Sequence, residues 1–177
     1  MAGYKNKGSN ILTGSNDVIG ALDSTVSISF PTPPPMSGTV SGYTSGGFAP
    51  PFSATIDKFP FAADANATDV GDLTVARFYS TGQSSTENGY TSSGSGTGGN
   101  IIDKFPFATD TNATDVGDLT VARDHTAGQS SQENGYTSGG NTSGSTIDKF
   151  PFATDTNATH VGNLTQGREE PAGQSSA

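Results

Sequence analysis

The chain has 177 residues, of which 24 are glycine and 31% are hydrophobic, and its net charge is −9 with only 8 Lys and Arg. A chain of this length fits one domain, but it has little apolar material per residue, so its core is expected to be thin or shared with other chains. There is no cysteine, which excludes disulfides and thiolate chemistry. The acidic charge argues against nucleic-acid binding, because contacts to phosphates need a basic surface.

The N-terminal residues carry two lysines, Lys5 and Lys7, and no apolar run behind them is long enough for the core of a signal peptide. No stretch approaches the length of a membrane span. We therefore expect no membrane insertion, and a chain that stays soluble in the compartment where it is made.

Residues 1–37 lack the repeat that follows and are predicted to form an N-terminal arm. Val26, Ile28 and Phe30 alternate with serines, which is the pattern of a half-buried strand. The run Pro-Thr-Pro-Pro-Pro at 31–35 then predicts an extended, polyproline-like linker. A disordered tail is the alternative, since the apolar content is small.

Residues 38–177 are organised around the segment Ile-Asp-Lys-Phe-Pro-Phe-Ala, which occurs at 56–62, 102–108 and 147–153. Each copy is followed by Asp-x-Asn-Ala-Thr, Val-Gly-(Asp/Asn)-Leu-Thr, an Arg and Gly-Gln-Ser-Ser. The spacings are 46 residues (Ile56 to Ile102) and 45 residues (Ile102 to Ile147). A period of about 40 to 50 residues is typical of propeller blades. Helix formers are sparse and no 3.6-residue apolar period is sustained, so the fold class is predicted to be all-β.

Four short antiparallel strands are predicted in each repeat. Asn88-Gly89 and Asn134-Gly135 suit the two central positions of a type I′ turn, which predicts a hairpin between Gly-Gln-Ser-Ser and Tyr-Thr-Ser. The Ile-Asp-Lys-Phe-Pro-Phe segment is the third strand. Its two phenylalanines project from one face, and its proline belongs at an edge or at the strand terminus. Val-Gly-Asp-Leu is the fourth strand.

The apolar positions of these strands are predicted to form the structural core. That core consists of Ile56, Phe59, Phe61, Leu73, Ile102, Phe105, Phe107, Leu119, Ile147, Phe150, Phe152 and Leu164.

The order Arg, Gly-x-Ser-Ser, turn, Tyr-x-x-Gly-Gly, Ile-Asp-x-Phe and Val-Gly-x-Leu resembles the kelch repeat over residues 39–177. The resemblance implies that each repeat is one blade of a β-propeller. The chain departs from the family pattern because it has no Trp, and because the Gly pair of the middle repeat lies later, at Gly98-Gly99. The most specific matching residues are Gly46, Gly47, Gly139, Gly140, Arg77, Arg123 and Arg168.

The repeated segments Asp-Lys-Phe-Pro-Phe and Gly-Gln-Ser-Ser are also similar to repeats in structural proteins of marine tailed phages, notably those of cyanobacteria. That resemblance implies a virion structural protein made in the host cytoplasm, either a tail appendage or fibre or a capsid decoration. The propeller would serve assembly or host-surface attachment, residues 1–37 would contact other virion proteins, and host-surface glycans are a further candidate partner. The alternative is a carbohydrate- or protein-binding propeller module of a cellular protein.

No catalytic, cofactor-binding or metal site is predicted, and we expect the protein not to be an enzyme. Asp64-x-Asn66-x-Thr68-Asp69 suggests a calcium loop but lacks its central Gly and distal Glu, so Asx-type turn capping is the better explanation. His125 and His160 occupy non-equivalent positions and are interpreted as surface substitutions. The repeated Arg and Asp-Lys positions are expected to anchor loops and join blades, since catalysis usually needs unlike residues at one point.

The two ends of the repeat region are complementary. The first repeat lacks a Gly-Gln-Ser-Ser strand before its Tyr-x-x-Gly-Gly, and the last repeat ends on that strand. Three blades are too few for a propeller, which typically has about 4 to 8. We therefore predict a head-to-tail homo-oligomer in which the C-terminal strand of one chain completes the first blade of the next. A ring of two chains is favoured and three or more is the fallback; the alternative is that the blades stack or combine with a different protein of the particle. The predicted latch residues are Tyr43, Gly46, Gly47, Gly173, Gln174, Ser175 and Ser176.

Overall fold

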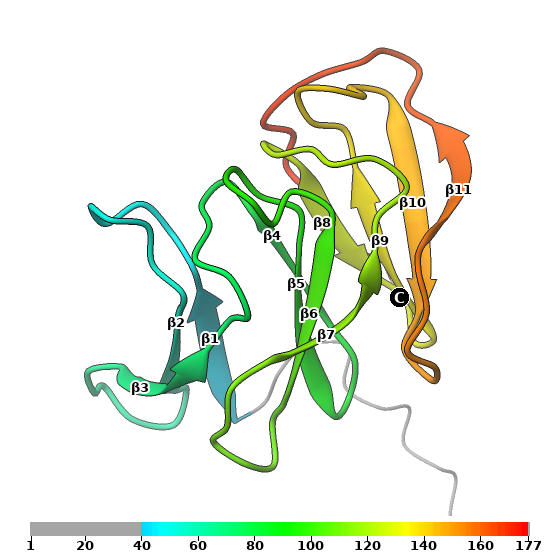
Figure 1. Cartoon of the computed structure of the whole chain (residues 1–177). Helices are drawn as coiled ribbons and strands as arrows, with labels where there is room; N and C mark the ends of the chain where they lie inside the picture. The colour runs from blue at the N-terminus through cyan, green and yellow to red at the C-terminus, as the bar shows by residue number, and fades with distance from the viewer. Residues whose placement is uncertain (1–39, 177) are drawn as a thin grey trace, which may run out of the picture. The chain divides into compact units, whose positions relative to one another are not determined.

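The computed structural model describes residues 40–176, and this part of the chain is all-β (Figure 1). The predicted arm and linker at 1–37 lie outside the described residues. The strands are β1 (Ser41–Ser45), β2 (Thr55–Pro60), β3 (Thr68–Asp72), β4 (Thr81–Ser84), β5 (Asn88–Ser92), β6 (Ile101–Pro106), β7 (Thr114–Asp118), β8 (Ala127–Ser130), β9 (Asn134–Ser138), β10 (Thr146–Pro151) and β11 (Thr159–Asn163). Between residues 40 and 176 there is no helix, and so none that could cross a bilayer.

The strands form three separate antiparallel sheets, one for each repeat (Figure 1). Sheet I has the order β1-β2-β3, sheet II the order β4-β5-β6-β7, and sheet III the order β8-β9-β10-β11. The predicted set of four strands is therefore present in sheets II and III. Sheet I has three, because no Gly-Gln-Ser-Ser segment precedes β1 in the sequence.

Each predicted hairpin is present, but its turn is not where the Asn-Gly pair predicts it. In sheet II, Ser84 pairs with Gly89, so Asn88 and Gly89 belong to strand β5. The turn lies at Thr86 and Glu87, where the Ser85 Oγ accepts the backbone N–H of Asn88 at 2.9 Å. A serine side chain thus closes the turn, and the glycine has another purpose: a Cβ at Gly89 would collide with the ring of Phe105.

The third strand of each repeat is the central one, and it ends on its proline. Pro60, Pro106 and Pro151 are the last residues of β2, β6 and β10, which confirms the predicted position at a strand terminus. The pairing with the fourth strand shifts register directly after the isoleucine, for example between Ile102 and Asp103. The fourth strand begins earlier than predicted, at the threonine two residues before Val-Gly, and its leucine follows the strand end.

The apolar core lies between neighbouring sheets in two clusters. Interface 1, between sheets I and II, contains Ile56, Leu73, Phe105 and Ala113, with Tyr43, Val70 and Phe107 packed against them. Interface 2, between sheets II and III, contains Tyr90, Ile102, Leu119, Phe150 and Ala158, with Val116 and Phe152 packed against them. Both clusters are formed by equivalent positions of the repeats, so the two interfaces have the same apolar packing.

The predicted core residues differ in burial according to the sheet face on which they lie. Ile56, Leu73, Ile102, Phe105, Leu119 and Phe150 are at most 5% exposed. Phe107 and Phe152 are partly buried against the clusters, and Phe59, Ile147 and Leu164 are half-buried. The prediction is wrong for Phe61, which is 54% exposed. Its equivalents pack on a tyrosine of the preceding sheet, and no described sheet precedes sheet I.

Candidate functional site: the interfaces between the sheets

A fully buried ion pair crosses each interface. The Arg77 Nη2 lies 2.9 Å from the Asp103 Oδ2 at interface 1, and the Arg123 Nη1 lies 2.8 Å from the Asp148 Oδ2 at interface 2. All four side chains are 0% exposed. Each arginine follows the last strand of one sheet, and each aspartate lies in the third strand of the next. The prediction that these arginines join repeats is confirmed.

Further hydrogen bonds hold both partners of each pair. Arg77 donates to the backbone carbonyl of Thr91 at 2.8 Å. The Asp103 carboxylate accepts the Thr74 hydroxyl at 2.7 Å and the Thr74 backbone N–H at 3.2 Å. Burial lowers the pKa of Arg77 from its ordinary value, and the charges of Asp103 and Asp115 oppose that shift. A carboxylate whose oxygens already accept three donors is occupied, so the pair is structural.

The same network surrounds the second pair. Arg123 donates to the carbonyl of Thr137 at 3.0 Å, and Asp148 accepts the Thr120 hydroxyl at 2.7 Å and its backbone N–H at 3.1 Å. In both networks the arginine Nε has no partner among the described residues. The repetition extends to the unpaired atom, which shows that the two interfaces share one geometry.

A second set of polar contacts lines the rim of each interface. The Lys58 Nζ lies 3.0 Å from the Asp110 Oδ1 at interface 1, and the Lys104 Nζ lies 2.6 Å from the Asp155 Oδ1 at interface 2. These pairs are partly exposed, so each contributes little to stability by itself. Their regular spacing still fixes how one sheet sits on the next.

The Asp-x-Asn loop takes part in this rim. The Asn112 side-chain oxygen accepts the backbone N–H of Asp72 at 3.1 Å, and Asn157 accepts that of Asp118 at 3.1 Å. The predicted Asx-type capping is present at the aspartates, since the Asp69 carboxylate accepts the backbone N–H of Gly71 at 3.1 Å and Asp115 makes the equivalent contact in the middle repeat. The asparagines instead cap a strand of the preceding sheet. No group of three or more His, Asp or Glu placed to hold a metal occurs within residues 40–176.

The Gly-Gln-Ser-Ser segments form a column along one edge of the sheets. The Ser84 backbone N–H donates to the Ser130 hydroxyl at 2.9 Å, and the Ser130 N–H donates to the Ser175 hydroxyl at 3.0 Å. Gln83 reaches from sheet II to sheet III, where it donates to the Tyr136 carbonyl and the Thr137 hydroxyl, both at 3.0 Å. Residues 173–176 thus lie beside β8 as β8 lies beside β4, but without a strand partner in the described chain.

This column leads to a glycine prediction. A Cβ at Gly128 would meet the carbonyl oxygen of Gly82, which is backbone and cannot move aside, whereas a Cβ at Gly82 has its nearest neighbour at 3.8 Å. We expect Gly128→Ala to lower the free energy of unfolding by at least about 1 kcal/mol and Gly82→Ala to change it by less than about 0.5 kcal/mol. Urea unfolding of both variants measures the difference. Equal effects would contradict the stacking of β8 on β4.

The predicted latch glycines serve the chain itself. The backbone N–H of Gly46 donates to the Thr55 carbonyl at 3.0 Å, and that of Gly47 donates to the Arg77 carbonyl at 2.9 Å. Gly46 has a φ of 67°, which glycine adopts without strain. Tyr43 stacks on Phe107 with ring centroids 4.9 Å apart at interface 1. Tyr43, Gly46 and Gly47 therefore have contacts within their own chain, and their predicted part in contacts between chains stays a prediction.

His125 is not a plain surface substitution. Its ring stacks on Tyr79 with centroids 3.7 Å apart, its Nδ1 lies 3.0 Å from Asp124, and its Nε2 lies 3.5 Å from Glu170. Tyr79, His125 and Glu170 occupy one repeat position, and each takes a φ between 52° and 57°. Differing residue types hid this column from sequence analysis, whereas the distance from the preceding arginine would have revealed it. His160 is exposed, as predicted.

Tyr90 is a core residue that the sequence analysis missed, and it leads to a pH prediction. Burial raises its pKa, and the charges of Asp155 and Glu87 add to the shift. Because the folded pKa lies above the unfolded value of about 10, the stabilisation is complete below about pH 10 and is lost as the pH rises through the folded pKa. We expect Tyr90→Phe to lose less stability than the parent between about pH 9 and pH 11. Denaturant midpoints measure this, with exposed Tyr79→Phe as the control.

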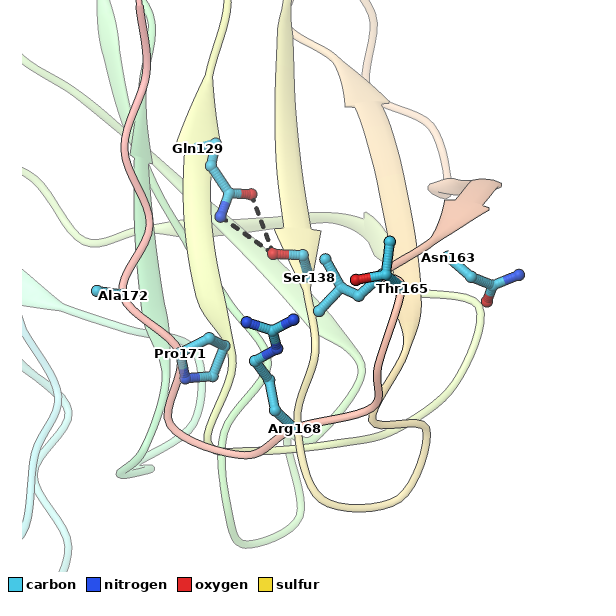
Figure 2. Close-up of a pocket in the computed structure, with 8 residues that line it drawn as sticks. Gln129, Ser138, Asn163, Thr165, Arg168, Pro171 and Ala172 are labelled. Carbon is cyan, nitrogen blue, oxygen red and sulfur yellow. Dashed lines mark hydrogen bonds between the residues drawn. The ribbon is translucent and has the colours of Figure 1, made fainter.

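The outer face of sheet III carries a hollow of about 370 Å³ (Figure 2). Arg168, Ser138 and Gln129 line it, together with Pro171 and Ala172 of the C-terminal segment. In Figure 2 the Arg168 guanidinium extends toward the Ser138 and Gln129 side chains, which hydrogen-bond each other at 3.0 Å. These positions correspond to Arg123, Ser92 and Gln83 in the interior of interface 2. The hollow is therefore an interface position without a neighbouring sheet in the described chain.

The comparisons with known proteins add no assignment. No protein-family model and no curated protein matches the chain. The interfaces described above are thus the basis for a functional proposal.

Proposed function

We propose that the protein is a structural component of a virion, either a tail appendage or fibre or a capsid decoration. The observation that carries the proposal is that both interfaces use one set of contacts, with the pairs Arg77–Asp103 and Arg123–Asp148 at their centres. Repeated contacts suit a scaffold or display module, whereas catalysis needs unlike groups at one point. The resemblance of the repeats to those in structural proteins of marine tailed phages is the reason for proposing a virion in particular.

We further propose that the three sheets are kelch-like blades of a β-propeller. Sheets II and III are four-stranded and antiparallel, and successive sheets pack through equivalent residues of the repeats. The column of β4, β8 and residues 173–176 at one edge supports this geometry, because a propeller arranges its sheets around a central channel. Residues 1–37 would then attach the propeller to other virion proteins.

Mass spectrometry of purified particles tests the virion proposal. We expect the chain to be present at a fixed copy number relative to the capsid protein, and a chain lacking residues 1–37 to be excluded from particles when it is expressed during infection. Absence of the full chain from particles would refute the proposal.

A second candidate function, binding of a carbohydrate or protein ligand, is favoured by one observation. Phe48, Phe52, Phe78 and Tyr79 form a contiguous aromatic cluster in which Phe52 and Phe78 have centroids 4.6 Å apart. Phe48 is 68% exposed and Tyr79 51% exposed. Large exposed apolar groups that touch one another mark interaction surfaces. Binding on a glycan array that is lost in Phe48→Ala and retained in Glu87→Gln would establish this function.

A further inference from the structure

We propose that the outer face of sheet III binds sheet I of a second copy of this chain, through the contacts that build interfaces 1 and 2. The proposal deepens the structural role above and rests on it for its biological purpose. The contact itself is a property of the purified chain, so it can be tested without particles.

The two members of the central ion pair are present separately, Arg168 after sheet III and Asp57 in sheet I. Arg168 follows β11 as Arg77 follows β3, yet it is exposed and pairs with no carboxylate in the described part of the chain. Asp57 holds in sheet I the position of Asp103 and Asp148, and it is only half-buried, with no hydrogen bond to its carboxylate among residues 40–176. The two uncovered faces at the ends of the described chain, one on sheet III and one on sheet I, are called the end faces. The end face of sheet III therefore carries the cation, and the end face of sheet I carries the anion, of one further pair.

The hydroxyl and amide contacts match in the same way. Ser45 bonds Thr91 at 2.5 Å across interface 1, and Ser92 bonds Thr137 at 2.7 Å across interface 2. The next pair in the series joins Ser138, which lines the hollow, to Thr44 of the second copy, which is exposed in the single chain.

The rim residues at the two ends are also complementary. Continuing the series Lys58–Asp110 and Lys104–Asp155 brings Lys149 to Asp64 of the second copy. Cβ atoms at Gly71 and Gly117 would press against the following sheet, at Thr111 and Thr156, whereas one at Gly162 meets nothing within 4 Å. Open space at this position alone is expected if its neighbour is another chain.

The apolar surface at the two ends follows the same rule. Tyr43 and Tyr90 lie on the phenylalanine pairs of the next sheet, with Tyr90 and Phe152 centroids 4.8 Å apart. Tyr136 is half-buried on the outer face of sheet III, and Phe61 is 54% exposed on sheet I. Placing Tyr136 over Phe59 and Phe61 of the second copy would cover both surfaces.

The C-terminal segment sets the register of the contact. In sheet II, Thr81 pairs with Ser92 and Gln83 pairs with Tyr90. Transferred by the repeat, this register pairs Ala172 with Ser45 and Gln174 with Tyr43 of the second copy, and residues 172–175 become the missing fourth strand of sheet I. The hollow and the incomplete sheet are thus filled by one association. Two copies would supply six sheets, within the range of about 4 to 8 found in propellers.

Disulfide trapping tests this arrangement, because the chain has no cysteine of its own. We would prepare full-length Thr44→Cys and Ser138→Cys, oxidise each alone and as an equal mixture, and analyse them on a non-reducing gel. The head-to-tail contact predicts a cross-linked dimer in the mixture and none in either variant alone. Ser92→Cys/Thr137→Cys, whose hydroxyls are 2.7 Å apart within one chain, is the positive control. Ser138→Cys mixed with Glu87→Cys is the negative control.

Sedimentation measures the affinity of the contact. We expect the parent to be a dimer or a larger assembly, and Asp57→Asn and Arg168→Ala to dissociate at least about 30-fold more readily while staying folded. Glu87→Gln, which removes one charge from the β4–β5 turn of sheet II and from neither sheet I nor sheet III, should assemble as the parent does. A monomeric parent, cross-linking of a single variant alone, or assembly unaffected by both charge variants would overturn the proposal. None of these results depends on whether the chain occurs in particles.

Discussion

Replacing Arg77 by Ala is expected to lower the free energy of unfolding by about 3–5 kcal/mol, a large part of the roughly 5–15 kcal/mol that stabilises a typical domain. The Asp103 carboxylate would stay buried at 0% exposure and lose the one cationic partner that it has within residues 40–176. The carbonyl of Thr91 would lose its donor as well. Urea unfolding followed by circular dichroism measures the change.

The repeat supplies a matched control for this prediction. Arg168 occupies the same repeat position but is exposed, so Arg168→Ala should change the stability of the dilute, dissociated chain by less than about 0.5 kcal/mol. Arg77→Met combined with Asp103→Leu should destabilise less than Arg77→Ala alone, because no buried charge is left unpaired. Equal losses for Arg77→Ala and Arg168→Ala would contradict a structural role for the buried pair.

The strands were predictable because the repeat shows each of them more than once. The Ile-Asp-Lys-Phe-Pro segment combines β-branched and aromatic residues with a proline that marks its end, and the strand stops at that proline in all three sheets. The hairpin turn was misplaced because Asn-Gly has two physical explanations. Local turn chemistry suggested positive φ, whereas Gly89 is needed to let the Phe105 ring lie across β5.

The sequence predicts which residue types join the sheets, but not which individual residues form buried contacts. A repeated arginine and a repeated Asp-Lys pair indicated joints between repeats, but no local pattern tells which arginine is buried. Arg77 and Arg168 hold the same position in their repeats but differ in exposure, because a further sheet follows Arg77 and no described sheet follows Arg168. The asparagine of the Asp-x-Asn loop was assigned to its own turn for the same reason: in the middle repeat this residue is Asn112, and its partner, Asp72, lies 40 residues earlier in the chain.

The second large effect is expected for Phe105→Ala. Phe105 is 5% exposed and packs against Tyr43 with ring centroids 5.6 Å apart. Removing a buried ring costs roughly 3 to 5 kcal/mol, because apolar burial is lost and the surrounding sheets close the cavity only in part. For a domain of this size the melting temperature should fall by about 10 °C or more.

Phe61→Ala is the control, because it removes the same side chain from an exposed position: Phe61, which corresponds to Phe107 in the next repeat, is 54% exposed. In the dilute, dissociated chain we expect it to change the melting temperature by no more than about 2 °C, because little apolar area is removed from a buried surface. At concentrations where the chain assembles, the same substitution should lower the melting temperature further, since the assembled form buries this ring under Tyr136 of the second copy and its binding stabilises the fold. A Phe105→Ala variant that melts with the parent would show that sheets I and II do not pack through this ring. If Phe61→Ala has an effect that does not depend on concentration, Phe61 is covered within its own chain.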